Sequence, residues 1–172
     1  MRLTVSVKIL HPTAQLLIET VTNLLDAKAA DQITSEEVLH LSGISRGSLY
    51  HHFEDLDELI EAALIQRYAR WVDASIELMT QLLTSAASSD DIYSGLTGIT
   101  RRTQSDEFRA ERQNRIDVLS RAGSSNRFAK LLGEEQQRLT DALTDLIREA
   151  QERGFYKKEV DARAIAVFIQ AY

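Results

Sequence analysis

The stretch from Arg46 to Phe53 carries side chains that could contact DNA. Leu49 and Phe53 are four residues apart, which puts them on one face of a helix, where we expect them to be buried. A guanidinium can make two hydrogen bonds to guanine, and hydroxyl and imidazole groups can bind base edges or phosphates. The other faces carry such groups, and the pattern therefore predicts a DNA-contacting helix. These groups belong to Arg46, Ser48, Tyr50, His51 and His52.

Local signals position this helix behind another helix and a tight turn. Thr34 followed by Glu37 matches the capping box that begins many helices. Gly43 suits the left-handed residue that ends such a helix, and Ser45 can cap the next one. The segment from Ile33 to Leu64 therefore predicts a helix-turn-helix with a supporting helix.

A long helix is predicted to follow. Asp55 with Glu58 repeats the capping pattern, and apolar residues keep helical spacing as far as Leu82. At 1.5 Å per residue this helix would be roughly 40 Å long. It would run from the first part of the chain into the second.

Composition favours an all-α protein and narrows its function. The 172 residues include one proline and lack strand-like runs, which predicts helices alone. The absence of cysteine excludes disulfides and cysteine-ligated zinc. No long apolar run or secretion signal occurs, so we expect a cytoplasmic protein without a membrane span. No acid–base or nucleophile constellation indicates an enzyme, and we expect no cofactor.

The charge distribution limits how the chain could bind DNA. The formal net charge is −6, and residues 1–65 hold four basic and ten acidic side chains. A protein that neutralises phosphates needs positive charge at the contact. Any DNA contact in this segment must therefore come from a small basic patch in an acidic domain.

The adjacent histidines His51 and His52 stand close in sequence to Glu54 and Asp55, as in some metal sites. Adjacent helix positions diverge by about 100°, however, and no second pair at ligand spacing exists. We therefore expect no metal site.

The arginine-rich segment 101–121 has two interpretations. A solvated, salt-bridged helix face is the simpler one. Alternatively, one or two arginines turn inward and bind an anionic effector such as a carboxylate or a phosphate. A cavity there would also need apolar and aromatic walls. The candidate ligand-binding residues are Trp71, Met79, Tyr93, Arg101, Phe108, Arg112 and Arg115.

The last two predicted helices suggest a dimer. The helix 127–153 is strongly amphipathic, and the segment 162–172 is apolar almost all round, so we expect it to be buried on several sides. One subunit cannot cover that much apolar surface, whereas a symmetric four-helix interface could. No C-cap signal precedes the end at Tyr172, so we expect truncation there. The expected interface residues are Leu139, Leu143, Leu146, Ile147, Ile165, Phe168 and Ile169.

The stretch from Thr34 to Leu64 resembles the DNA-binding half of the TetR family of bacterial transcriptional regulators. The resemblance implies three small DNA-reading helices, a long linking helix, a ligand-binding body, and two C-terminal helices that pair with a second subunit. The matching residues are Thr34, Val38, Ser42, Gly43, Ile44, Ser45, Gly47, Leu49, Tyr50, His52, Phe53 and Leu59.

The resemblance also implies roles for individual residues. Thr34 and Ser35 would approach a phosphate at a helix N-terminus. Tyr50 and His52 would hold the DNA backbone, and Gly47 would allow close approach. The candidates for base edges are Arg46, Ser48 and His51.

We predict a ligand-responsive, homodimeric repressor that binds palindromic operator DNA and is released by a small-molecule effector. Residues 1–65 would bind DNA, and residues 66–172 would bind the ligand and dimerise. The sequence departs from the family pattern at Leu56, where a basic residue is common, and at Ala30-Asp31, where a glycine is usual. With the acidic first segment, Leu56 motivates the alternative: a helical ligand-binding or interaction protein of the same fold that has lost sequence-specific DNA binding.

Overall fold

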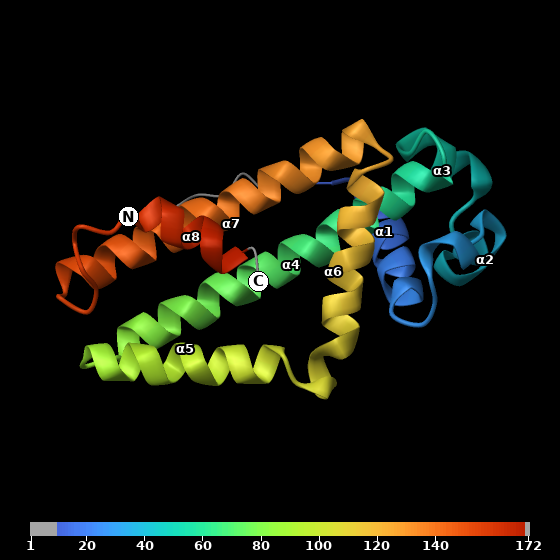
Figure 1. Cartoon of the computed structure of the whole chain (residues 1–172). Coiled ribbons are helices and arrows are strands. Elements are labelled where there is room, and N and C mark those ends of the chain that lie inside the picture. Colours follow the sequence, from blue (N-terminus) through green and yellow to red (C-terminus); the bar gives the residue numbers. More distant parts are fainter. Residues whose placement is uncertain (1–9, 171–172) are drawn as a thin grey trace. The chain divides into compact units, whose positions relative to one another are not determined.

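The computed structural model describes residues 10–170, which contain helices and no strand (Figure 1). The predicted all-α fold is therefore confirmed. The expected truncation at Tyr172 lies outside the described residues. By its internal contacts the chain divides into two compact parts, an N-terminal unit, Met1–Arg67, and a C-terminal unit, Tyr68–Tyr172.

The N-terminal unit contains α1 (Pro12–Leu25), a 3₁₀ turn (Ala30–Gln32), α2 (Ser35–Ser42), α3 (Arg46–His52) and the start of α4 (Leu56–Ser85). Helix α1 contacts both α2 and α3. The buried apolar side chains come from all four helices, so helix α3, which carries the predicted DNA-contacting residues, is anchored in a core. This core includes Leu17, Val21, Val38, Leu49, Leu59 and Ala63.

The turn between α2 and α3 has the predicted geometry. The Thr34 hydroxyl accepts a hydrogen bond from the Glu37 amide at 3.3 Å, and the Ser45 hydroxyl accepts one from the Ser48 amide at 3.2 Å. Gly43 ends α2 in the left-handed region, with φ of +68°. An L-residue there would be strained, which explains the glycine.

The predicted capping box of Thr34 and Glu37 is corrected in part, because the Glu37 carboxylate has another partner. The Glu37 carboxylate forms an ion pair with Lys28. In the second predicted box, Asp55 accepts a hydrogen bond from the Glu58 amide at 2.7 Å, and the Glu58 carboxylate accepts one from the Glu54 amide, one residue before Asp55.

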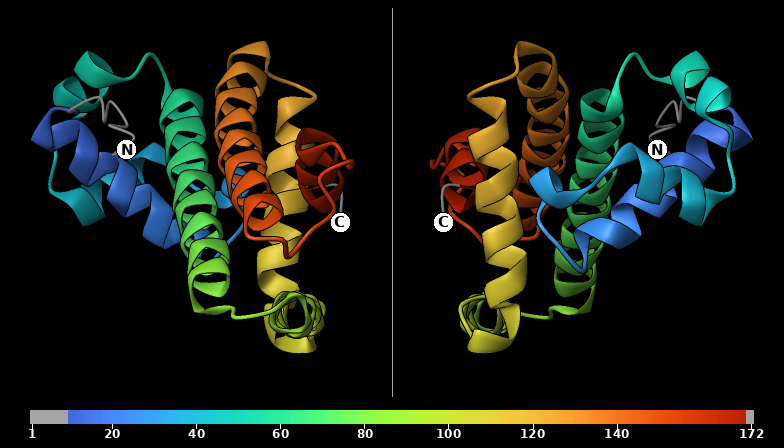
Figure 2. Two further views of the ribbon diagram at one scale, coloured as in Figure 1. Left: turned by 90° about the vertical axis from the view of Figure 1, so that its left-hand side faces the viewer. Right: turned by 90° about the vertical axis from the view of Figure 1, so that its right-hand side faces the viewer.

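The C-terminal unit contains the rest of α4, then α5 (Ser89–Thr103), a 3₁₀ turn (Asp106–Phe108), α6 (Arg109–Ala122), α7 (Asn126–Glu152) and α8 (Ala162–Gln170). Helix α7 contacts α6 and packs along α8 (Figure 2). Arg138 on α7 donates hydrogen bonds to the Asp73 carboxylate and the Ala69 carbonyl on α4. Helix α7 therefore connects most of this unit.

Apolar residues near the ends of α4, α5 and α7 form one cluster of the C-terminal unit. A capping box of Ser88 and Asp91 begins α5 next to this cluster. Because helix ends meet here, the cluster sets where α5 turns back from α4. Its members are Leu83, Ala86, Ile92 and Ala150, with Leu82, Leu96, Leu146 and Phe155 packed against them.

Helix α8 is buried on one side only, which corrects the prediction that it is covered on several sides. Ala162 and Ala166 are buried, but Val167 is 54% exposed and Phe168 is 64% exposed. Since α8 packs mainly along α7, its apolar residues on other faces remain accessible. A helix that is apolar on every face is buried on every face only where other elements pack against it.

Arg153 ties the end of α7 to the end of α4, and replacing it should destabilise the C-terminal unit. Its guanidinium donates to the carbonyls of Leu83 and Ala86 and lies over the Phe155 ring, 4.5 Å from the centroid. Carbonyls at a helix C-terminus lack partners in the helix and favour a cation. Arg153→Met should lower the free energy of unfolding by about 1–2 kcal/mol.

Urea unfolding followed by circular dichroism, at one protein concentration, measures this loss. The matched control is Arg148→Met, which removes an exposed arginine that pairs with Asp145 at 3.2 Å. Exposed pairs contribute little, so the control should change the unfolding free energy by less than about 0.5 kcal/mol. Equal losses in the two variants would refute the capping role of Arg153.

Candidate functional site

Helix α3 presents its predicted DNA-contacting residues at the surface of the N-terminal unit. Arg46, Gly47, Tyr50 and His51 are exposed, and Ser48 and His52 are partly exposed. Leu49, on the opposite face, is fully buried. Because the buried residue fixes the rotation of α3, the polar residues share the outward faces. Nothing lies within 4 Å of the position a Gly47 Cβ would take, so this site is open to an approaching molecule.

The N-terminus of α2 presents the second predicted contact. Thr34 is exposed and Ser35 is partly exposed. The Thr34 hydroxyl accepts the capping hydrogen bond but keeps its own hydrogen to donate. Glu36 and Glu37 lie in the same first turn and oppose an anion, although Lys28 neutralises Glu37. Phosphate binding here would rest on the amides and hydroxyls.

Three histidine rings form a cluster that the sequence does not reveal. His11, the N-cap of α1, stacks on His52 with 4.9 Å between centroids, and the His51 ring meets His52 edge-on at 5.0 Å. Within residues 10–170, neither this cluster nor another group of three or more His, Cys, Asp or Glu side chains has an arrangement that could hold a metal ion. His11 and His52 are far apart in sequence, so no local pattern joins them.

The histidine cluster should make the stability of the protein depend on pH. Partial burial lowers the pKa of His52 from its ordinary 6.5, and the charges of His11 and His51 lower it further. Below about pH 6.5 the unfolded chain therefore binds more protons than the folded one. The free energy of unfolding should fall as pH drops through this value, until the lowered pKa is passed.

His52→Gln should flatten this part of the pH profile. Unfolding curves between about pH 7.5 and about pH 5 measure the effect, since only histidines change charge over most of that range. His40→Gln, which removes an exposed histidine on α2, is the matched control. Identical profiles for the two variants would contradict the role of His52.

A pocket of about 390 Å³ lies in the C-terminal unit. Its walls come from α4, α5, α6, α7 and α8. It brings together five of the predicted ligand-binding residues, Trp71, Met79, Phe108, Arg112 and Arg115.

Two other predicted ligand-binding residues, Tyr93 and Arg101, are exposed and do not line this pocket. Both lie on α5, which lends other residues to the wall: Leu96, Ile99, Thr100 and Thr103. The rotation of α5 therefore decides which of its side chains can meet a ligand.

Two arginines of α6 border the pocket with well-defined contacts. Nη1 of Arg112 donates to the carbonyls of Thr103 at 2.6 Å and Ser105 at 2.8 Å. The Arg115 guanidinium lies 5.1 Å from the centroid of the Trp71 ring. Both side chains are partly exposed. Arg112 and Arg115 therefore border the pocket, as the second interpretation of this segment requires, and their binding of an anionic effector stays a prediction.

The same pocket corrects part of the predicted dimer interface. Leu139 and Leu143 are 2% and 4% exposed and line the pocket, so they face the inside of their own subunit. The apolar stripe of α7 is covered here by other helices of the same subunit, so this part of it needs no second subunit. Phe168 and Ile169 also line the pocket but stay 64% and 37% exposed.

The three remaining interface candidates, Leu146, Ile147 and Ile165, are partly buried. The accessible apolar surface of this region is therefore centred on α8, to which Val167 also belongs. Sequence reasoning did not include Val167.

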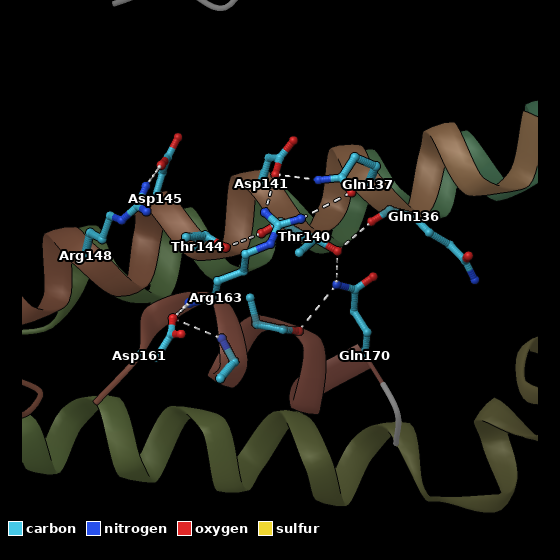
Figure 3. Close-up of polar contacts among 12 residues, drawn as sticks. Gln136, Gln137, Thr140, Asp141, Thr144, Asp145, Arg148, Asp161, Arg163 and Gln170 are labelled. Atoms are coloured by element: carbon cyan, nitrogen blue, oxygen red, sulfur yellow. Dashed lines mark hydrogen bonds and ion pairs between the residues drawn. The ribbon is translucent and has the colours of Figure 1, made fainter. Parts of the chain in front are cut away.

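Polar contacts hold α8 on α7 (Figure 3). The Arg163 guanidinium donates to Asp141 at 2.9 Å and to the Gln137 side chain at 3.2 Å. At the other end of α8, the Gln170 side chain donates to the Thr140 hydroxyl at 2.7 Å. These contacts fix the rotation of α8, and with it the residues that border the pocket.

This arrangement of a helix-turn-helix unit and a helical unit with a pocket is the fold of TetR-type transcriptional regulators. A Mesorhizobium loti protein assigned to that family superposes with a TM-score of 0.71 over 90% of this chain and 75% of its own, at 16% sequence identity. Salmonella enterica GusR gives a TM-score of 0.66 over 95% of this chain and 82% of its own, at 20% identity.

Escherichia coli NemR in its reduced form gives a TM-score of 0.66 over 92% of this chain and 81% of its own, at 16% identity. The resemblance inferred from the residues is therefore confirmed at the level of the fold. No family model and no curated protein matches the sequence. No helix within residues 10–170 is long and apolar enough to cross a membrane.

Proposed function

We propose that this protein is a cytoplasmic, ligand-responsive transcriptional repressor that binds double-stranded operator DNA as a homodimer. The observation that carries the proposal is the outward face of α3. It presents Arg46, Ser48, Tyr50 and His51 next to a capped turn, while Leu49 anchors the opposite face. The fold shared with solved TetR-type regulators supports the same assignment.

The DNA contacts would divide into two kinds. Arg46, Ser48 and His51 would read base edges in the major groove, where Arg matches the two acceptors of guanine. Thr34, Ser35, Tyr50 and His52 would position the phosphate backbone, and Gly47, which has open space around it, would let α3 come close. Because the surrounding segment is acidic, specific contacts rather than general charge would supply most of the affinity.

Dimerisation would use the accessible apolar surface of α8 together with α7. Val167, Phe168 and Ile169 are exposed in the subunit, and contiguous exposed apolar residues often mark an interface. A two-fold axis through this surface would present two copies of α3 to successive major grooves, roughly 34 Å apart on a palindrome.

The pocket in the C-terminal unit would take the effector. A ligand that fits one spacing of the two α3 helices better than the other would shift the population toward it. DNA, which requires the other spacing, would then be released. We therefore expect the effector to weaken operator binding.

Selection from a genomic DNA pool, followed by fluorescence anisotropy at several salt concentrations, tests the proposal. A regulator should select a palindromic sequence, and its affinity should fall as salt rises. Binding of all sequences alike, or of none at low salt, would overturn the proposal.

A second candidate function has its own support. Residues 1–65 carry a net charge of −6, and the first residue of α4 is the apolar Leu56. A protein of this fold that had lost sequence-specific DNA binding would still use its pocket or its apolar surface. Ligand binding without any DNA selection would favour this candidate.

A further inference from the structure

We propose that the pocket of the C-terminal unit takes a monoanionic amphiphile, a molecule with one carboxylate and an apolar body. The inference rests on the proposed ligand response and names the chemical class of that ligand. It is carried by the two arginines of α6 and by the apolar walls opposite them.

Arg112 is held so that one edge of its guanidinium is left for a ligand. Both of its hydrogen bonds to other described residues use Nη1, which donates to the carbonyls of Thr103 and Ser105. A guanidinium has five N–H donors, and the edge formed by Nε and Nη2 remains available for hydrogen bonds to a ligand. This edge makes two parallel hydrogen bonds to a carboxylate. Because two backbone carbonyls fix the group, little conformational entropy is lost on binding.

Arg115 adds a second positive charge one helical turn further along α6. Its guanidinium lies over the Trp71 ring, and no ion pair with a carboxylate is found for it among residues 10–170. Stacking on an aromatic ring uses the face of the guanidinium, so the N–H donors at its rim remain available to a ligand. Glu111 is the acidic residue of the lining, so the pocket carries an excess of one positive charge. One carboxylate on the ligand would balance it.

The other walls favour an apolar body. Leu78, Met79, Leu96, Ile99, Leu139 and Leu143 line them. A volume of about 390 Å³ lies within the range of small-molecule sites. An apolar body buried there gains from leaving water, and its carboxylate reaches the arginines. A cation would meet two like charges, and a neutral molecule would leave the Arg112 edge unpaired.

Isothermal titration calorimetry of the full chain tests this class with probes of matched shape. The anions are decanoate, below its micelle concentration, and naphthalene-2-carboxylate; the neutral partners are decan-1-ol and naphthalene-2-methanol. At least one carboxylate should bind about tenfold or more tightly than its alcohol. Decyltrimethylammonium should not bind. If neither carboxylate exceeds its alcohol, or if the cation binds as tightly, the proposal is overturned.

Substitutions of the two arginines test their contribution to ligand binding separately from any contribution to folding. Arg112→Lys keeps the charge but removes the bidentate edge, and Arg115→Met keeps contact with Trp71 but removes the charge. Each should weaken carboxylate binding about 10- to 100-fold and change alcohol binding much less, so the preference for the carboxylate should be lost. The control is Arg109→Gln, which replaces an exposed arginine of the same helix that pairs with Asp106 outside the pocket. The unliganded melting temperature of each variant reports whether it folds.

The titration uses no DNA, so its outcome is independent of DNA binding. Carboxylate binding without any DNA selection would support the proposed ligand class and overturn the proposed regulator function. DNA selection without preference for a carboxylate would overturn the ligand class alone.

Discussion

Val167→Glu should convert the proposed dimer into a monomer and weaken operator binding about 100-fold or more. Val167 is 54% exposed in the subunit and lies beside Phe168 on α8, so the change leaves the core of the subunit intact. In a dimer the same glutamate would be buried without a partner, which is costly. A monomer also forgoes the gain from holding two half-sites at once, which reaches 10²- to 10⁴-fold for linked modules.

Analytical ultracentrifugation and anisotropy on the selected operator measure both effects. The chain offers a close control in Val160→Glu. Val160 is 41% exposed and lies in the connection between α7 and α8, so the same charge is introduced outside the proposed interface. If Val167→Glu stays dimeric while binding DNA normally, the α8 interface is wrong. If both variants become monomeric, charge rather than position is responsible.

Arg46→Ala should relax the base preference at one position of each half-site and leave the other positions unchanged. Arg46 is exposed at the first turn of α3, and a bidentate arginine contributes about 1–3 kcal/mol of discrimination between bases. This corresponds to roughly 5- to 150-fold in relative affinity. The substitution removes no hydrogen bond of the Ser45 cap, so the fold of α3 should persist.

Tyr50→Phe is the comparison for Arg46→Ala. It removes one exposed hydroxyl from the same helix, and without the phosphate hydrogen bond of that hydroxyl the protein should bind every operator sequence more weakly by the same factor. Affinities for a set of single-base operator variants measure both changes. If the two substitutions alter the same positions, or if both weaken every sequence equally, the division into base and backbone contacts is incorrect.

Local signals made the helix-turn-helix region predictable. Thr34 and Ser45 cap their helices through amides three residues away, and Gly43 takes the left-handed conformation within one turn. Such contacts need only neighbouring residues, so they can be inferred directly from the sequence. The four-residue spacing of Leu49 and Phe53 likewise indicated the buried face of α3.

The pocket was predictable only in part. Trp71, Phe108, Arg112 and Arg115 were recognised by residue type, because a site for an anionic effector needs aromatic walls and fixed cations. Tyr93 and Arg101 have the same chemistry but do not line the pocket. On α5 the residues Ile92, Leu96 and Ile99 recur at helical spacing and mark the inner face, and Tyr93 and Arg101 lie off that stripe. Selection by residue type without regard to this spacing therefore included two residues that face outward.

By itself the amino-acid sequence determined the helices, the capped turn and the kinds of side chain available for contact. Tertiary structure decided their partners. It buried Leu139 and Leu143 inside the subunit, left Val167 accessible, and brought His11 onto His52. The physical reason is range: a helix and its cap depend on residues within one turn, whereas the partner of an apolar stripe, a carboxylate or a ring depends on segments that meet only when the chain folds.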